Sequence, residues 1–358
     1  MRLAPIAMSV LTGCKGILGI ENGVVSGDAA LVDATSDALI DVPPDTRTCW
    51  GTFQPICPMP VPTDVYAVSG FTVFDTLFQC PSIETIGGVE VCVKAARVIT
   101  IAPGTTFQTV GSRHLVLVAT EQMTIGGTLD GWGGAASSCN TVNATGTGAG
   151  GPGGSLLVFG GDGGASLSAG TNPGAVVPAI STFRRGCPGG NGGSMSPPGG
   201  SGGAGGSGIF LVSPSIRITS SARINASGSG GVGGDNDRGG GGGGSGGVIV
   251  FDTEALTIEA GAIVVALGGG GGGGGGAGQG IAGTRAGAIM PVAPGLGGSG
   301  NAGASGDGGD ATLAIGNDGG TATNGRGGGG GGGAVGVILT TTTNVMNNGI
   351  VMPALLSP

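Results

Sequence analysis

Glycine is concentrated in the second part of this chain, and that distribution limits the folds open to it. Of the 88 glycines among 358 residues, 13 lie in residues 1–130 and 75 lie in residues 131–358, where about one residue in three is glycine. Glycine loses more conformational freedom on folding than any other residue and adds no side chain to a core. An ordered fold in this region therefore needs apolar segments between the glycine tracts, or very close packing of the backbone.

The rest of the composition excludes several classes of protein. Charged residues make up 9% of the chain and hydrophobic residues 39%, whereas disordered chains combine high charge with few apolar residues. The 13 Lys and Arg residues against 21 Asp and Glu give a net charge of −8, so nucleic acid is disfavoured as a partner. A collagen helix is excluded because the chain has no sustained Gly-X-Y repeat rich in proline, and no run of 18 apolar residues predicts a membrane-spanning helix.

The first residues, 1–14, resemble a bacterial lipoprotein signal. Arg2 is followed by a short apolar stretch, Leu3–Val10, and Leu-Thr-Gly-Cys at residues 11–14 matches the lipobox pattern. The resemblance implies cleavage before Cys14, acylation of that cysteine and anchoring by the acyl chains. Lys15 rather than an aspartate follows, which favours the outer membrane as the partner of this anchor. The alternatives are an unmodified, buried Cys14 and a true start upstream of Met1.

Residues 15–47 are predicted to form a flexible acidic tether. Between residues 21 and 45 six acidic residues occur without a lysine or arginine, and the segment ends in Pro43-Pro44. Like charges repel one another and keep such a segment extended. The tether would separate the lipid from a folded body, which we divide into a cysteine-containing cap with the first strands (48–130) and a glycine-rich repeat region (131–358).

The cysteines favour an oxidising compartment. With Cys14 set aside for lipid, six cysteines remain, an even number that suits three disulfides. Six cysteines allow fifteen pairings, of which the nearest-neighbour pairing is our prediction. Zinc is disfavoured because no C-x-x-C spacing occurs and the chain has 1 histidine. The candidate disulfide cysteines are Cys49, Cys57, Cys80, Cys92, Cys139 and Cys187.

Four segments share one pattern, in which an apolar run, a polar gap, a second apolar run, a turn and a third run follow each other. The second runs alternate apolar and polar residues, as in Met123-Thr124-Ile125, which predicts strands with one buried face. The recurring order predicts an all-β fold, an irregular right-handed parallel β-solenoid with one repeat per rung. An antiparallel sandwich is the alternative. The segments are Leu115–Asp130, Ile209–Ala226, Val248–Ala266 and Val335–Pro353, with a partial copy at Val98–Phe107.

The glycine insertions 131–208, 227–247 and 267–334 follow the strand segments. Glycine recurs at every third residue in places, as from Gly297 to Gly309, and three residues per turn is the period of polyproline II. Chains without Cβ atoms can approach closely enough to pair their backbones. We therefore predict polyglycine II chains packed beside the solenoid, with unordered loops as the alternative.

Three elements of the sequence are distinctive: CWGTFQPIC at residues 49–57, SRHLVLVATEQMTIGGTLD at residues 112–130 and FRRGCPGGNGG at residues 183–193. Together they resemble a group of glycine-rich exported proteins, including lipoproteins, that are common in myxobacteria. The resemblance covers roughly residues 48–350 and implies a surface or secreted location, but no particular chemistry. The glycine layout is also similar to phage tail-fibre adhesins that present loops on polyglycine II layers, a likeness of architecture alone.

Few residues offer chemistry. His114 precedes a predicted strand, and we expect it at the surface. No metal or cofactor is predicted: the calcium nonapeptide pattern fails, and a G-x-G-x-x-G match carries no information in a chain this rich in glycine. The aspartates considered for metal, and preferred as solvated turn residues, are Asp235, Asp237, Asp307 and Asp310.

These observations favour a lipid-anchored or exported cell-surface structural or adhesive protein without catalytic activity, whose partners are surface glycans or other cells. Contacts are expected on the loops Thr171–Arg185 and Gln279–Leu296. The alternative is a carbohydrate-active β-solenoid enzyme of the polysaccharide lyase or hydrolase kind, which needs carboxylates clustered on one face. The strand acids available for this are Glu121, Asp130, Asp252, Glu254 and Glu259. The sequence does not indicate an oligomeric state.

Overall fold

The computed structural model describes residues 48–132, 139–177, 179–193, 199–287, 295–300, 315–322 and 326–357. All of them belong to one unit of the chain, Arg47–Pro358. The predicted lipoprotein signal with Cys14 and the predicted acidic tether lie outside the described residues.

Regular structure in the described residues consists of β-strands, with no helix among them. The strands before the first glycine insertion are β1 (Val65–Val68), β2 (Phe71–Asp75), β3 (Ser82–Ile86), β4 (Val89–Ile101), β5 (Thr106–Val110), β6 (His114–Ile125) and β7 (Thr128–Gly131). Those that follow are β8 (Gly208–Val212), β9 (Ser215–Ile218), β10 (Arg223–Asn225), β11 (Val248–Asp252), β12 (Ala255–Ile258), β13 (Ile263–Val265), β14 (Val337–Thr340), β15 (Val345–Asn347), β16 (Ile350–Met352) and β17 (Leu355–Leu356).

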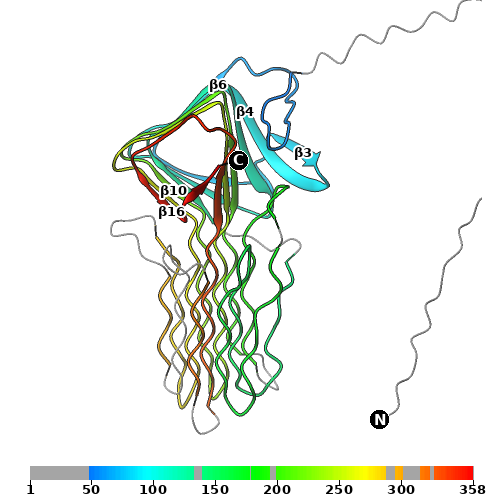
Figure 1. Ribbon diagram of the computed structural model, residues 1–358, viewed down its shortest axis with the longest axis vertical. Helices are drawn as coiled ribbons and strands as arrows, with labels where there is room; N and C mark the ends of the chain where they lie inside the picture. The colour runs from blue at the N-terminus through cyan, green and yellow to red at the C-terminus, as the bar shows by residue number, and fades with distance from the viewer. Residues whose placement is uncertain are drawn as a thin grey trace, which may run out of the picture. The chain divides into compact units, whose positions relative to one another are not determined.

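The strands form two sheets that curl around a shared interior as a half-barrel (Figure 1). The larger sheet has 11 strands, with the order β15-β12-β9-β6-β8-β11-β14-β17 and with β1, β3 and β4 joined to it through β4. The smaller sheet has 6 strands in the order β16-β13-β10-β7-β5-β2. All the pairings are parallel except that of β3 with β4, which is antiparallel.

The predicted β-solenoid is wrong for this chain. Strand β6 runs for 12 residues, and its first half pairs with β8 while its second half pairs with β9. Strand β4, with 13 residues, lies along the whole of β6. Two runs that the repeat pattern separates by a polar gap therefore belong to one curled sheet instead of two faces of a rung. The prediction failed because apolar periodicity cannot distinguish two strands joined by a turn from one long strand that bends.

Strands β8 and β11 are buried on both faces. Ile209 and Leu211 of β8 lie in the interior of the half-barrel, whereas Phe210 and Val212 pack in a second apolar cluster on the opposite face. Parallel sheets are commonly covered on both faces, which gives their strands unbroken apolar runs. The register keeps like residues in line: Ile209 pairs with Ile249 and Phe210 with Val250.

The glycine-rich insertions run as long extended chains away from the strands, not along the flank of the sheets (Figure 1). We call these chains the glycine bundle. Its described segments are 150–154, 160–164, 186–193, 199–207, 226–234, 239–247, 266–275, 280–284, 295–298, 316–320 and 327–336.

Backbone hydrogen bonds join the bundle in several directions. Segment 239–247 donates to three neighbours in turn, and each neighbour receives a bond from every third residue. Three residues per turn is the period of a polyproline II-type helix, and it points successive N–H groups to successive sides. The bonds run from Gly240, Gly243 and Gly246 to Gly328, Gly331 and Ala334; from Gly241, Gly244 and Gly247 to Val232, Ser229 and Ala226; and from Gly242 and Ser245 to Gly190 and Cys187.

At glycine positions inside the bundle, an added side chain would collide with the backbone of a neighbouring chain. A Cβ atom on Gly242 would lie 1.9 Å from the carbonyl oxygen of Pro152, and one on Gly243 would lie 2.0 Å from that of Gly269. Because these neighbours are backbone atoms, they cannot move aside as a flexible side chain would. A side chain lies at the outside at Ser201, which is exposed, whereas the small side chain of Ser245 is buried and its Oγ accepts a hydrogen bond from Cys187 N at 2.8 Å. The bundle is thus packed backbone against backbone.

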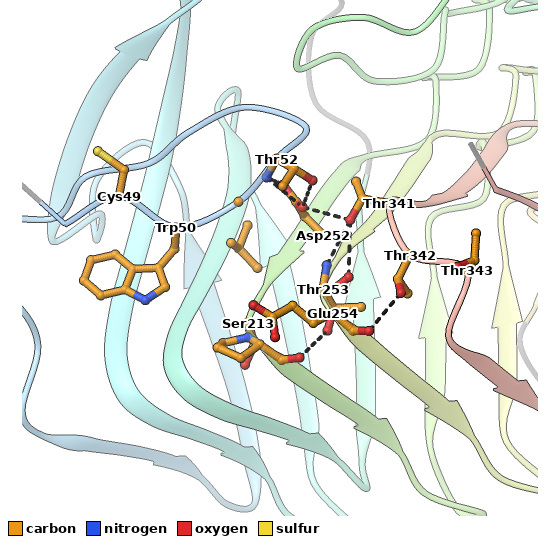
Figure 2. Close-up of a pocket in the computed structure, with 13 residues that line it drawn as sticks. Cys49, Trp50, Thr52, Ser213, Asp252, Thr253, Glu254, Thr341, Thr342 and Thr343 are labelled. Carbon is orange, nitrogen blue, oxygen red and sulfur yellow. Dashed lines mark hydrogen bonds between the residues drawn. The ribbon is translucent and has the colours of Figure 1, made fainter.

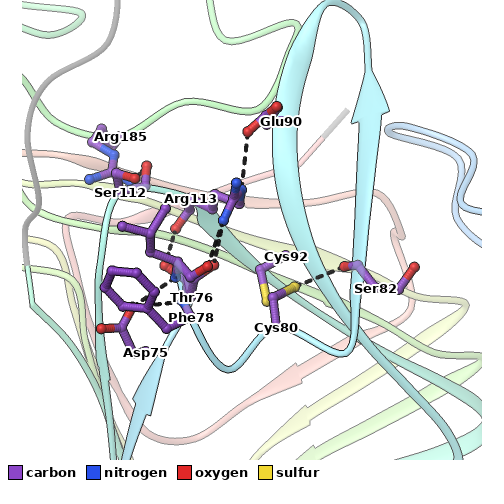
Figure 3. Close-up of polar contacts among 11 residues, drawn as sticks. Asp75, Thr76, Phe78, Cys80, Ser82, Glu90, Cys92, Ser112, Arg113 and Arg185 are labelled. Atoms are coloured by element: carbon purple, nitrogen blue, oxygen red, sulfur yellow. Dashed lines mark hydrogen bonds and ion pairs between the residues drawn. A yellow bond between two sulfur atoms is a disulfide. The ribbon is translucent and has the colours of Figure 1, made fainter.

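Three disulfides brace the fold, and they join the nearest neighbours in the sequence: Cys49–Cys57, Cys80–Cys92 and Cys139–Cys187. The second connects the turn after β2 with β4, where Arg113 adds polar contacts (Figure 3). Its Nε lies 3.1 Å from Glu90 Oε2, and its Nη1 donates to the carbonyl oxygen of Leu77 at 2.9 Å. The three disulfides indicate a non-reducing environment.

Candidate functional site

A loop closed by the Cys49–Cys57 disulfide is fastened to the end of β11 by a buried carboxylate. Asp252, 4% exposed, accepts hydrogen bonds from the backbone N–H groups of Thr52 (2.8 Å) and Phe53 (2.8 Å). The hydroxyl groups of Thr52 and Thr341 donate to its Oδ1, both at 2.9 Å (Figure 2). We call this arrangement the Asp252 latch. It joins residues 200 apart in the sequence.

Gly51 permits the close approach of the loop. Its φ of +94° lies in the left-handed region, and a Cβ atom there would lie 2.7 Å from Asp252 Oδ2. A residue with a side chain would be strained and would collide with the carboxylate. Beside it, Phe53 stacks on Phe210 with ring centroids 6.0 Å apart, and Ile56 is fully buried. The loop is therefore held by apolar packing as well as by the latch.

The loop forms one side of a cleft of about 600 Å³. The other sides are the connections that follow β8, β11 and β14, which lie side by side in the larger sheet. In Figure 2, Trp50 and Thr343 lie at opposite ends of the labelled set, with Ser213, Asp252 and Glu254 between them. The volume falls in the usual range for small-molecule sites.

Three groups in the cleft are open to a ligand. Glu254 is exposed, and no hydrogen bond or ion pair engages its carboxylate among the described residues. Over the same residues, the Trp50 indole N–H has no acceptor, and the exposed Thr343 hydroxyl has no partner. By contrast, Thr342 Oγ1 donates to the backbone oxygen of Glu254 at 2.8 Å and accepts from Asn344 N at 3.0 Å. The open groups are one donor, one acceptor and one hydroxyl that can do both.

The other strand acids are engaged and widely distributed. Glu121 pairs with Arg97 at 2.7 Å, Asp130 with Arg285 at 3.0 Å, and Glu259 with Arg217. The hydrogen bonds of Glu259 with Arg217 and Ser220 lower the pKa of its carboxyl group. Of the five strand acids, only Asp252 and Glu254 line the cleft. Because the hydrogen bonds of the latch engage the Asp252 carboxylate, Glu254 is the only one of the five that is free there.

His114 is buried, so the expectation of a surface histidine is wrong. It is 2% exposed and meets the ring of Phe210 edge-on, with centroids 5.9 Å apart. Burial, and secondly the charges of Arg185 and Arg184, lower the pKa of His114 to about 3. The imidazole is therefore neutral at physiological pH. Its position inside the fold removes it from the cleft.

The two stretches expected to carry contacts contain both packed and exposed residues where they are described, and Ile281 and Leu296 are 61% and 56% exposed. Phe183 packs against Phe210 with centroids 4.5 Å apart, and Arg185 is 2% exposed. Arg285, from the second stretch, pairs with Asp130 and lies 5.3 Å from the centre of the Trp132 ring.

The aspartates considered for metal do not form a site in the described part of the chain. Asp235 and Asp237 flank a turn in which Asn236 and Asp237 have positive φ, and both aspartates are exposed. Asp307 and Asp310 lie outside the described residues. No group of three His, Cys, Asp or Glu side chains suited to a metal occurs among the described residues.

Comparison of the chain with protein-family profiles, with curated proteins and with solved structures finds no match. A search of the described residues for helices that are long and apolar enough to cross a membrane also finds none.

Sequence reasoning missed Trp50 and Thr343 as site residues. Trp50 belongs to a motif that the sequence displays, CWGTFQPIC. The carboxylate that holds this loop in place, that of Asp252, lies 200 residues after Thr52 in the sequence. The available signal was a tryptophan within a short disulfide-closed loop.

Proposed function

We propose that this protein is an exported structural and adhesive protein of the cell surface, without catalytic activity. The proposal includes an anchor in the outer membrane through a lipid on Cys14. The folded body stands away from the membrane on the acidic segment 15–47, and its partners are surface glycans or other cells. The observation that carries the proposal is the backbone-packed glycine bundle.

The bundle supports a structural role because of what its packing excludes. Catalysis and ligand recognition need side chains that converge on one point. Around Gly242 and Gly243 a single added carbon would collide with backbone atoms, so that region holds no such group. Hydrogen bonds in three directions stiffen the chains against bending. A stiff element of this kind serves to space and present the curled sheets.

The proposed location is supported by two features. Three disulfides fit an oxidising compartment outside the cytoplasm. The Leu-Thr-Gly-Cys motif at residues 11–14 fits a lipid-modified cysteine, and one acyl chain alone binds a membrane only weakly, so the multiple acylation typical of such signals suits a stable anchor.

The absence of catalysis is supported by the state of the carboxylates. A glycosidase uses two carboxyl groups, one as acid and one as base or nucleophile. In the cleft the latch engages both oxygens of Asp252, and Glu254 would act alone. A lyase acting on acidic sugars also needs a cation, and none of the 13 residues that line the cleft is lysine or arginine.

The experiment that tests the proposal is fractionation of cells grown with a labelled fatty acid, with the parent chain compared with Cys14→Ala. We expect label and protein together in the outer-membrane fraction for the parent, and an unlabelled, released protein for the variant. Protein that stays in the cytoplasm in both cases would contradict the proposal. Release of reducing sugar from cell-surface polysaccharide by the purified chain would contradict the absence of catalysis.

A further inference from the structure

We propose that the cleft bounded by Trp50, Glu254 and Thr343 is a binding site for neutral, hydroxyl-rich carbohydrate. The inference rests on the proposed surface role and names the class of ligand that such a protein would hold. It assigns an adhesive contact to the cleft beside the connections that follow β8, β11 and β14.

The cleft combines an aromatic ring with hydrogen-bonding groups. Trp50 is half-buried and lines the cleft, so part of its ring contacts the fold while part faces the space. An indole offers an apolar face and a polar edge. A sugar ring likewise has an apolar C–H face and a rim of hydroxyl groups. The two surfaces match in a way that a purely apolar or purely charged ligand would not.

The open polar groups of the cleft complement the hydroxyl groups of a sugar. The Trp50 N–H is a donor, the Glu254 carboxylate an acceptor, and the Thr343 hydroxyl can do both. Hydroxyl groups of a sugar both donate and accept, so they satisfy all three. A hydrogen bond to a charged group such as Glu254 is among the stronger ones in proteins.

The charge of the cleft disfavours anionic ligands. Among its lining residues are Asp252 and Glu254, and none is lysine or arginine. Sugars that carry carboxylate, sulfate or phosphate would be repelled by Glu254 and would find no cation to pair with. The cleft therefore favours neutral glycans over acidic ones.

The walls of the cleft are preorganised for binding. The Trp50 loop is closed by the Cys49–Cys57 disulfide, pairs its own backbone between Trp50 and Ile56, and is fastened by the Asp252 latch. The threonine hydroxyls of residues 341 and 342 are held by hydrogen bonds to Asp252 and to the backbone of Glu254. A site whose walls are already fixed loses less entropy when a ligand binds.

The experiment measures binding of the purified full chain to an array of neutral and acidic glycans, followed by titration of the best neutral one. Two variants test the site. Trp50→Ala removes the stacking surface, and Glu254→Ala removes the free acceptor; the exposed position of Glu254 makes the second variant safe for folding. Trp132→Ala is the matched control, because Trp132 is 49% exposed and does not line the cleft.

We expect binding to neutral glycans, weakened about tenfold or more by Trp50→Ala and about tenfold by Glu254→Ala, and changed less than about twofold by Trp132→Ala. The inference is overturned if no neutral glycan binds, if acidic glycans bind better, or if both cleft variants bind like the parent. Capture of a peptide in the cleft, in place of sugar, would also overturn it. Membrane fractionation of the same variants should match the parent, so a failed inference leaves the location intact and the two failures are distinguishable.

Discussion

In the curled sheets, side chains fill the interior and the backbone serves as the frame; in the glycine bundle, the backbone fills most of the interior and only a few small side chains are buried. The interior of the half-barrel is lined by residues such as Ile209, Leu211 and Phe251. The bundle around Gly242 holds carbonyl and amide groups in contact instead. The sheets therefore depend on burial of apolar area, whereas the bundle depends on hydrogen bonds and on the absence of Cβ atoms.

One chain therefore combines two kinds of packing, and the bundle segments continue directly into the strands of the sheets. Gly247 donates to Ala226 in the bundle, and the next residue, Val248, begins β11. The disulfide Cys139–Cys187 joins two segments of the first insertion in the same region. If the two regions differ in this way, removal of a side chain should destabilise the sheets, whereas addition of a single carbon should destabilise the bundle.

The largest effect is expected from loss of a core ring. Phe210→Ala should lower the free energy of unfolding by about 4 kcal/mol, because the ring is 1% exposed and contacts Phe53, Phe183 and His114. Phe78→Ala is the matched control, since Phe78 is 82% exposed, and it should change stability by less than about 0.5 kcal/mol. Chemical denaturation of both variants checks the prediction, which fails if the two lose equal stability.

In the bundle, a smaller loss of stability is expected from adding an atom, in contrast to the loss from removing a ring in the sheets. Gly242→Ala adds one carbon and should lower the free energy of unfolding by about 2 kcal/mol, because the new Cβ would lie 1.9 Å from the carbonyl oxygen of Pro152. Ser201→Ala removes one atom from an exposed position of the same bundle and should be neutral within about 0.5 kcal/mol. Thermal unfolding measures both. A neutral Gly242→Ala would show that the bundle interior tolerates side chains.

The smallest change in the free energy of unfolding is expected for a change of one pH unit. The pKa of His114 falls from 6.5 to about 3 in the fold, so below pH 6.5 the unfolded chain takes up a proton that the folded chain does not. Stability should decrease as the pH falls from 6.5 towards 3, on the order of 1 kcal/mol per pH unit from this residue. His114→Leu should lack that part of the slope. Parallel slopes for the parent and the variant in denaturant titrations across this range would contradict a buried, neutral His114.

The apolar pattern located most of the strands but not their arrangement. The segment Ile209–Ala226 contains β9 and β10 and all of β8 but its first residue, and Val248–Ala266 contains β11 to β13, because alternation and β-branched residues depend on local burial. The three-residue glycine phase likewise matches the spacing of the bundle's hydrogen bonds. The continuation of β6 from its pairing with β8 to its pairing with β9 was not predictable, because both partner strands lie about 90 residues later in the sequence.

The candidate site was the least predictable part. Asp252 and Glu254 were two of the five strand acids considered, and the hydrogen bonds that engage only Asp252 involve Thr52, which lies 200 residues earlier in the sequence. The latch turns one carboxylate into a structural group and leaves the other open. No local pattern encodes such a contact, since it arises from the way the sheet brings the ends of distant strands together.

Hydrogen exchange of the bundle amides measures directly whether the glycine chains are ordered by their own backbone hydrogen bonds. If they are, the amides of Gly240, Gly243 and Gly246 should exchange about as slowly as those of β11. Exchange of these glycine amides at the rate of an unstructured peptide, while β11 remains protected, would contradict it.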